Sequence, residues 1–174
     1  MALRQILTEP NKILRQKSLP VDKVDSEIQK LMDDMLETMY AAPGIGLAAI
    51  QVGVPKRIIV IDIGQKEGEK KPMFIVNPEI VQRSEIHSTY EEGCLSVPGQ
   101  FAEISRPDKC YIKYLDYNGS QIELKAQGML ATCIQHEMDH LEGILFIDYL
   151  SKLKKSMIIK KLSKQKRAIE RIVV

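Results

Sequence analysis

MLATCIQHEMDHLEG, residues 129–143, is the stretch of the chain that decides its fold. We predict a helix over this stretch, ended by Gly143. Because residues four apart lie on one face of a helix, the rings of His136 and His140 can bind one metal ion. The carboxylate of Glu137 can then accept a proton from a water on that ion. HExxH strings also arise by chance as solvated helix faces, so the pentapeptide predicts a hydrolase centre only together with a third ligand.

A catalytic site of this kind needs a third protein ligand and one open position for water or substrate. Downstream of His140 the sequence holds no histidine or cysteine. Glu142 follows by two residues, so its side chain should point away from the face of the two rings. Asp148 and Glu170 stay open as ligands, although no motif surrounds them.

Three upstream residues are less suited to bind the ion. Cys133 shares the helical face of His136, but its short thiol lies too far along the helix axis, which favours a position in a pocket wall or core. Cys110 falls in the alternating stretch 109–117, where a buried strand thiol is the simpler interpretation. His87 stands alone, as surface and turn histidines commonly do, and we place it outside the site.

Two glycine-containing segments are better candidates for the walls of a site. Cys94 stands in EGCLS, residues 92–96, which can present a thiolate and a free backbone N–H together. GIGLAAIQ, residues 44–51, has two glycines and two alanines, which let an extended peptide come close to the backbone. Gln51 adds an amide donor at the end of this run. Tight packing is the commoner reason for such a run of small residues.

Three segments, GIGLAAIQ, EGCLS and QHEMDH, follow one another in this order along the chain. Together they resemble the three signature motifs of the peptide deformylases, and the similarity extends over nearly the whole chain. The resemblance implies a hydrolase that binds one Fe²⁺ ion and removes the formyl group from the N-terminal formylmethionine of newly made proteins. It also implies three metal ligands, Cys94, His136 and His140.

The same resemblance implies roles for the residues around the metal. Glu137 would be the general acid and base, while the Gln51 amide and the Leu95 backbone N–H would stabilise the anionic oxygen of the transition state. Formyl is the smallest acyl group, so small residues closing the pocket would exclude larger ones. A methionine-sized pocket is expected beside it. The expected substrate-binding residues are Ile45, Gly46 and Cys133.

The identity of the metal is only partly set by its ligands. Thiolate and imidazole also suit Zn²⁺, Ni²⁺ and Co²⁺, which we expect as substitutes in purified protein. Fe²⁺ follows from the resemblance alone. If Fe²⁺ is bound, oxygen should inactivate the enzyme, because both the ion and the Cys94 thiolate can be oxidised.

Length and composition indicate a compact enzyme. A chain of 174 residues with 44% hydrophobic content predicts one catalytic domain, residues 1–174. No apolar run is long enough to cross a bilayer, and the first residues lack the apolar stretch of a signal peptide. Three cysteines without a pairing pattern indicate a reducing compartment. We therefore expect a cytoplasmic monomer that acts on nascent peptides and binds neither DNA nor membranes.

The periodicity of apolar residues predicts an α+β fold. Mixed short strands should pack around the central metal-binding helix, with one helix before them and one after. Ser26 to Gln29 is interpreted as a capping box that opens the first helix, which Pro43 and Gly44 end. The remaining predictions are strands at 58–63 and 73–76, a polar loop at 64–71, and short strands and turns over 80–125 with a hairpin turn at Asn118-Gly119.

The last segment, residues 151–174, carries nine basic residues and one acidic residue, a charge of +8 against −6 for the rest of the chain. We predict an amphipathic helix from Ser151. Its apolar stripe should dock on the body and consists of Leu153, Met157, Ile158, Leu162 and Ile169. A solvated basic face is the simpler interpretation. Contact with ribosomal RNA is the more specific interpretation, and the resemblance implies such a contact for some bacterial members of the family.

Two other functions fit parts of the sequence. A small metalloprotease would use the same HExxH chemistry but would have no need of Cys94 or of the small residues before Gln51. A nucleic-acid-binding module with a structural metal would be built around the basic tail. A structural metal site closes all four positions with protein ligands, whereas the motif residues provide three.

Overall fold

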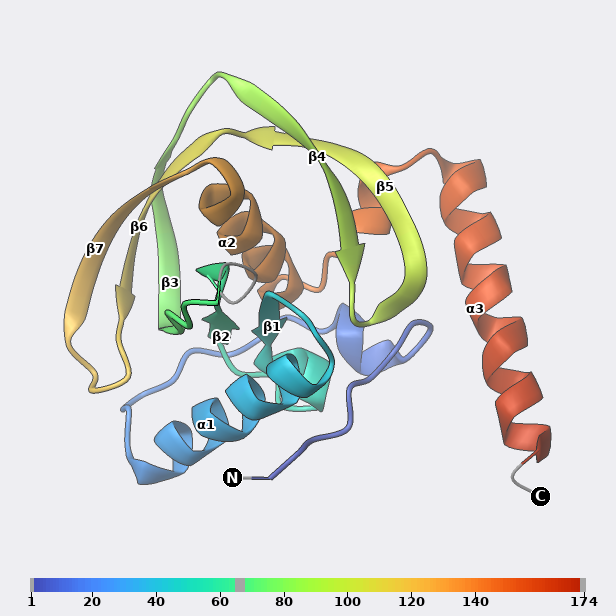
Figure 1. Cartoon of the computed structure of the whole chain (residues 1–174), viewed down its shortest axis with the longest axis horizontal. Coiled ribbons are helices and arrows are strands. Elements are labelled where there is room, and N and C mark those ends of the chain that lie inside the picture. Colours follow the sequence, from blue (N-terminus) through green and yellow to red (C-terminus); the bar gives the residue numbers. More distant parts are fainter. Residues whose placement is uncertain (1, 65–67, 173–174) are drawn as a thin grey trace.

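The computed structural model describes residues 2–64 and 68–172, and it has the predicted α+β architecture (Figure 1). A five-stranded antiparallel sheet has the order β1-β2-β3-β6-β7, and β4 and β5 form a separate antiparallel ribbon. The strands are β1 (Gly46–Ala48), β2 (Ile58–Ile61), β3 (Met73–Arg83), β4 (His87–Cys94), β5 (Val97–Pro107), β6 (Lys109–Leu115) and β7 (Gln121–Gln127). The helices are α1 (Ser26–Ala41), α2 (Gly128–Leu141) and α3 (Lys152–Ile172).

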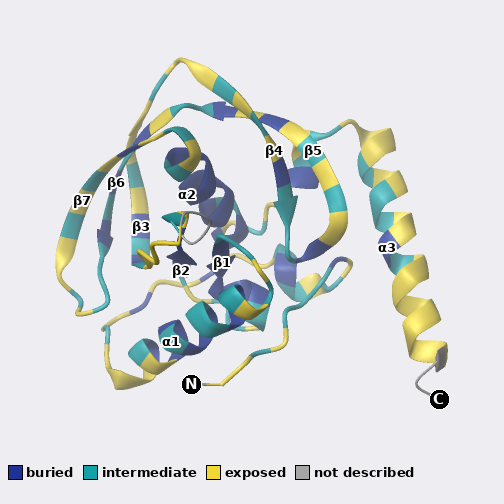
Figure 2. Cartoon of the chain, viewed as in Figure 1, coloured by how far each residue is buried: buried dark blue, intermediate teal, exposed yellow. Residues whose placement is uncertain are grey.

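Helix α2, which contains the HExxH motif, lies at the centre of the molecule and is buried along most of its length (Figure 2). The ribbon β4–β5 passes over one side of it, and the sheet encloses the other (Figure 1). Inward-facing Cys110, Ile112 and Tyr114 of β6 share one apolar cluster with Ala131 and Ile134 of α2. The apolar residues alternate in β6 because one face of the strand is buried against α2, as expected.

Strand β2 is buried on both faces, which explains its unbroken apolar sequence. Ile59 and Ile61 belong to the apolar cluster around α2, whereas Ile58 and Val60 belong to the cluster around α1. Helix α1 thus lies on the opposite side of β1 and β2 from the metal-motif helix (Figure 1). These two layers fix the position of residues 44–51 against α2.

Several predicted boundaries need correction. The N-cap of α1 is Asp25, whose side chain accepts hydrogen bonds from the N–H groups of Glu27 and Ile28, so the capping box predicted from Ser26 is wrong. The strand predicted at 58–63 ends at Ile61. The strand predicted at 73–76 continues to Arg83, and β4 and β5 are long rather than short.

Two loop predictions have different outcomes. The hairpin turn at Asn118-Gly119 is confirmed: Gly119 has a φ of 81°, and the Asp116 N–H donates to the Ser120 carbonyl across the turn. The polar loop predicted at 64–71 falls partly on residues 65–67, outside the described residues.

Helix α3 stands beside the body and contacts it along one part of its length (Figure 1). Ile158 and Leu162 pack against the cluster that contains Phe146 and Val97, as predicted. The rest of the predicted stripe is wrong, because the side chains of Leu153, Met157 and Ile169 are more than half exposed. Among the described residues, no helix combines the length and the apolar character needed to cross a membrane.

Candidate metal centre and active site

The structure brings Cys94, His136 and His140 together at the inner end of the ribbon. Strand β4 ends at Cys94, directly over the face of α2 that carries the two histidines. One potential ligand atom from each of the three residues lies within 4.8 Å of the others. Cys94 Sγ is 3.3 Å from His140 Nε2, and the two histidine rings are 5.2 Å apart between centroids.

The chemistry and spacing of these three groups fit a metal ion of the Fe²⁺ or Zn²⁺ type. Two ligands that bind one ion tetrahedrally at about 2.0 to 2.3 Å lie about 3.5 Å apart, close to the Cys94–His140 separation. Both histidines are buried and Cys94 is partly buried. Burial, assisted by the charge of Arg106, lowers the pKa of His140 well below its usual value, so this ring stays neutral as a metal ligand must.

A buried carboxylate orients one of the histidines. Glu92 Oε2 lies 2.9 Å from His136 Nδ1, and Arg106 donates from Nε to Glu92 Oε1 at 2.6 Å and from Nη2 to Oε2 at 3.0 Å. Burial alone would raise the pKa of Glu92, but the bonds from His136 and Arg106 hold it below its usual value. An ionised acceptor at Nδ1 leaves Nε2 of the His136 ring for the metal.

Glu137 is held in a different environment from Glu92. Its side chain is buried, and burial raises its pKa to about 7, although the charge of His136 opposes the shift. Its Oε2 atom has no hydrogen-bond partner among the described residues. A carboxylate with a pKa near neutrality and a free oxygen has the properties of a general base.

The side chain of Gln51 is fixed beside Cys94. Its Oε1 accepts from the Ala48 N–H at 2.8 Å, and its Nε2 donates to Ser96 Oγ at 3.0 Å. The same nitrogen lies 3.5 Å from Cys94 Sγ, so the amide donor faces the proposed metal ligands. Leu95 stands next to Cys94 in the turn that joins β4 to β5, and it lines the cavity that opens beside these residues.

A cavity of about 570 Å³ opens beside this cluster and is lined by all of the expected substrate-binding residues. Ile45 and Gly46 come from the segment before β2, and Cys133 comes from α2. Burial raises the pKa of the Cys133 thiol well above its usual value, which keeps it protonated. Its Sγ lies 3.8 Å from the Ile45 carbonyl. Cys133 lies outside the cluster of three ligand atoms and forms a pocket wall, as predicted.

The residues that were set aside or left open as ligands lie elsewhere. Cys110 is buried in the sheet, and His87 is exposed with Nδ1 near the Glu85 carbonyl. Glu142 forms an ion pair with Arg57, and Asp148 forms one with Arg15. Glu170 is exposed on α3.

Sequence reasoning missed three residues around the cluster, namely Glu92, Arg106 and Ser96. Glu92 had a usable signal, because residues two apart in a strand share a face and Glu92 precedes Cys94 by two. Arg106 had none, since only the pairing of β4 with β5 brings it to Glu92. Ser96 lies in the turn, where sequence does not predict what its hydroxyl meets.

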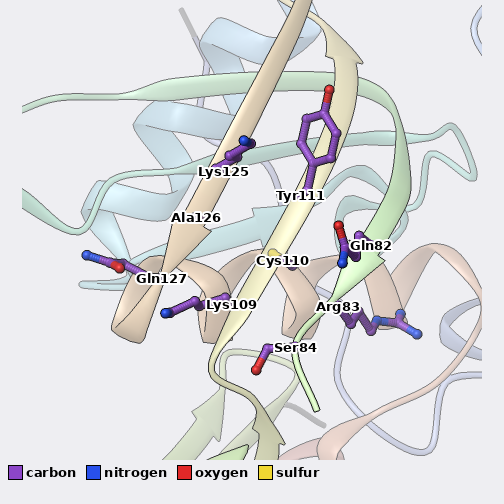
Figure 3. A pocket seen from close by; sticks show the side chains of 9 residues that line it. All are labelled: Gln82, Arg83, Ser84, Lys109, Cys110, Tyr111, Lys125, Ala126 and Gln127. Atoms are coloured by element: carbon purple, nitrogen blue, oxygen red, sulfur yellow. The ribbon is translucent and has the colours of Figure 1, made fainter. Parts of the chain in front are cut away.

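A second cavity, of about 420 Å³, lies against β3, β6 and β7 and includes none of the motif residues (Figure 3). Three of its lining side chains are basic: Arg83, Lys109 and Lys125. Figure 3 shows Arg83 and Lys109 pointing in opposite directions, so the positive charges do not converge on one point. The metal-ligand cluster and the first cavity therefore form the better candidate site.

Comparison with known proteins points to one family. A family model described as polypeptide deformylase matches residues 3–156. A peptide deformylase of Pelagibacter ubique is 69% identical over 174 residues, which is 100% of both chains, and one of Phenylobacterium zucineum is 58% identical over 97% of this chain and 99% of its own. The crystal structure of a peptide deformylase from Ehrlichia chaffeensis in complex with actinonin superposes with a TM-score of 0.92 at 50% identity, covering 96% of this chain and 99% of that one.

Proposed function

The chain belongs to the polypeptide deformylase family, and from this premise we propose how its own residues carry out the reaction. The enzyme is a hydrolase that removes the N-formyl group from newly made peptides. Members of the family depend on a metal, and the cluster of one cysteine and two histidines fits that requirement. The observation that carries the proposal is the position of this cluster, with the free carboxylate oxygen of Glu137, beside one cavity.

We propose that Cys94, His136 and His140 hold the metal and that Fe²⁺ is the native ion. When bound, the ion supplies a Lewis acid and an activated water near neutral pH. Three ligands leave an open position, as a catalytic site requires. The contact from Glu92 to His136 would fix the ring that the metal needs.

Proton transfer is assigned to Glu137. Its free Oε2 takes the proton from the attacking water and later hands it to the leaving amine, a role worth roughly 10²- to 10⁴-fold in rate. The formyl oxygen becomes anionic as water adds to the carbon. The Gln51 amide and the Leu95 N–H are proposed to donate to it, each at a cost of about 10²-fold in kcat if removed.

Selectivity for formyl is assigned to the tight space beside Glu137. A side-chain carbon added at Gly46 would lie 2.8 Å from Glu137 Cδ, so the backbone of β1 and this carboxylate are already in contact. An acyl group larger than formyl would need that space. Ile45 and Cys133 line the adjoining part of the cavity, where the methionine side chain is proposed to bind.

The decisive experiment compares formate release from formyl-Met-Ala-Ser with cleavage of Met-Ala-Ser. We expect formate release by the wild-type enzyme, no cleavage of the unformylated peptide, and loss of formate release in Glu137→Ala. Glu142→Ala is the matched control, since Glu142 follows α2 and pairs with Arg57 outside the site. Substantial formate release by Glu137→Ala would refute the assigned mechanism, cleavage of Met-Ala-Ser would indicate a protease, and no hydrolysis of either would leave a binding module.

The identity of the metal is tested by loading the protein with different metal ions. Protein purified without oxygen should contain iron and lose activity in air, and Ni²⁺ or Co²⁺ should restore it. Equal activity of zinc-only and iron-loaded protein would contradict the assignment of Fe²⁺.

We also propose that residues 1–174 act as one monomeric domain in the cytoplasm, where nascent chains are made, and that α3 contacts the ribosome. Lys160, Lys164 and Lys166 are exposed side chains of α3. Changing these three lysines to Gln should weaken salt-sensitive sedimentation with ribosomes and spare hydrolysis of the short peptide. The matched control replaces the three basic residues that line the cavity of Figure 3, and equal weakening in the control would contradict a specific role for α3.

A further inference from the structure

The segment at residues 7–9 joins the two parts of the chain that carry the proposed oxyanion donors. The Leu7 N–H donates to the Gln51 carbonyl at 2.7 Å, and the Glu9 N–H donates to the Ser96 carbonyl at 2.8 Å. The Gln51 side chain closes the ring through its 3.0 Å bond to Ser96 Oγ. Gln51 and Ser96, 45 residues apart in sequence, are therefore held together by backbone bonds from this short segment.

A partly buried ion pair anchors this segment to the rest of the chain. The Glu9 carboxylate is 6% exposed and accepts a hydrogen bond from Arg15 Nη2 at 3.1 Å. Arg15 donates from Nη1 to Asp148 Oδ2 at 2.6 Å, and the Leu145 N–H donates to the same oxygen at 2.9 Å. The guanidinium is thereby tied to the short helix Phe146–Tyr149. The Glu9 carboxylate is thus linked through Arg15 to Asp148, a residue remote in sequence.

Neither Glu9 nor Arg15 lines the substrate cavity, so their role is not contact with the peptide. A partly buried ion pair contributes little net stability compared with well-packed apolar residues, so it is weak evidence for a purely stabilising role. Oxyanion stabilisation, by contrast, depends on donors that are preorganised at hydrogen-bond distance before the reaction begins. A fixed spacing between Gln51 and the turn containing Leu95 meets that requirement.

We propose that Glu9, held by Arg15, is a positioning residue that sets the spacing of the oxyanion donors through the segment at residues 7–9. The inference rests on the proposed function, because it takes Gln51 and Leu95 as those donors. Without the Glu9 carboxylate the segment loses its anchor to Arg15. The two backbone hydrogen bonds of the segment then no longer hold Gln51 and Ser96 at a fixed distance from each other.

The test compares Glu9→Ala, Glu9→Gln and wild-type enzyme on formyl-Met-Ala-Ser, at a temperature where circular dichroism shows each to be folded. Since donors are displaced rather than deleted, we expect kcat to fall about tenfold in Glu9→Ala with KM within about twofold of wild type. The Gln side chain can still accept from Arg15, so Glu9→Gln should recover most of kcat. Faster hydrogen exchange at the Leu7 and Glu9 amides should accompany the loss.

Arg4→Ala is the matched control. Arg4 ties the same N-terminal stretch to α1 through Asp34, with Nη2 3.0 Å from Oδ2, but does not reach the donors. It should lower the melting temperature and leave kcat unchanged. An unchanged kcat in Glu9→Ala, or an equal loss in Arg4→Ala, would overturn the positioning role. An unchanged kcat in Gln51→Ala would instead overturn the proposed oxyanion donors, so the two failures are distinguishable.

Discussion

Replacing Gly46 with Ala tests how closely β1 must approach the proposed proton carrier. Gly46 does not adopt a positive φ, so alanine is compatible with its backbone, and only space is at issue. The added carbon would stand 2.8 Å from Cδ and 2.9 Å from Cγ of Glu137, whereas ordinary contacts begin at 3.4 Å. The carboxyl group must therefore move by at least about half an ångström, in a region where Glu137 is only 4% exposed.

A displacement of this size acts on the chemical step. Misplacing a reacting group by 1 Å costs about 10²-fold in rate, so we expect kcat for formyl-Met-Ala-Ser to fall about ten- to a hundredfold. Metal content should stay unchanged, because the three atoms nearest to the added methyl group all belong to Glu137 and none to a proposed ligand. The fall should appear in kcat, with a smaller change in KM.

A double-mutant cycle with Glu137→Gln decides whether the methyl group acts through this side chain. If it does, Gly46→Ala should add little to the loss already caused by Glu137→Gln. Full activity of Gly46→Ala would refute the reasoning. So would a second, independent loss of the same size in the Glu137→Gln background.

Three further outcomes are expected. Arg106→Met should cost about 3–5 kcal/mol in the free energy of unfolding, because it removes the cation that pairs with the buried Glu92 carboxylate, and should weaken metal affinity about 10- to 100-fold; urea unfolding and chelator competition measure these two effects. The hydrogen bond from the Ala2 N–H, against the effect of burial, holds the pKa of Asp34 below its usual 3.8. The ionised Asp34 carboxylate therefore stabilises the folded state above pH 3.8, and this stabilisation is lost as the pH falls below that value. Asp34→Asn should make the free energy of unfolding less dependent on pH in this acid range. Leu162→Ala should loosen α3 and increase its proteolysis, whereas Leu153→Ala, at an exposed position, should not.

The periodicity of apolar residues predicted the buried helices and strands because apolar residues recur where an element faces the core. The apolar run at 58–63 predicted a buried strand, which the structure shows to be covered on both faces, and the spacing of the two histidines predicted their common face on α2. The predicted start of α1 was wrong because two neighbouring residues can both cap a helix. Asp25 and Ser26 are both good N-caps, and the sequence alone does not decide which of them accepts the helix N–H bonds.

Contacts that depend on how the ribbon passes over α2 were out of reach of sequence. Cys94 could be proposed as a ligand, but its approach to His140 depends on the course of β4 and β5. The partnership of Arg106 with Glu92 has the same origin. The apolar stripe of α3 misled for a different reason: helical spacing shows which residues share a face, and not how much of that face has a partner.

The two ends of the chain offer very different places for chemical attachment. Helix α3 has 21 residues, about 32 Å, and its buried contact with the body at Leu162 is followed by a run of exposed side chains from Lys164 to Arg171. At the other end, the Ala2 and Arg4 backbone N–H groups are bonded to side chains of α1. A dye, bead or surface linked near Arg171 should therefore leave the enzyme working. The same label near Ala2 would pull on the chain that leads to the catalytic cleft.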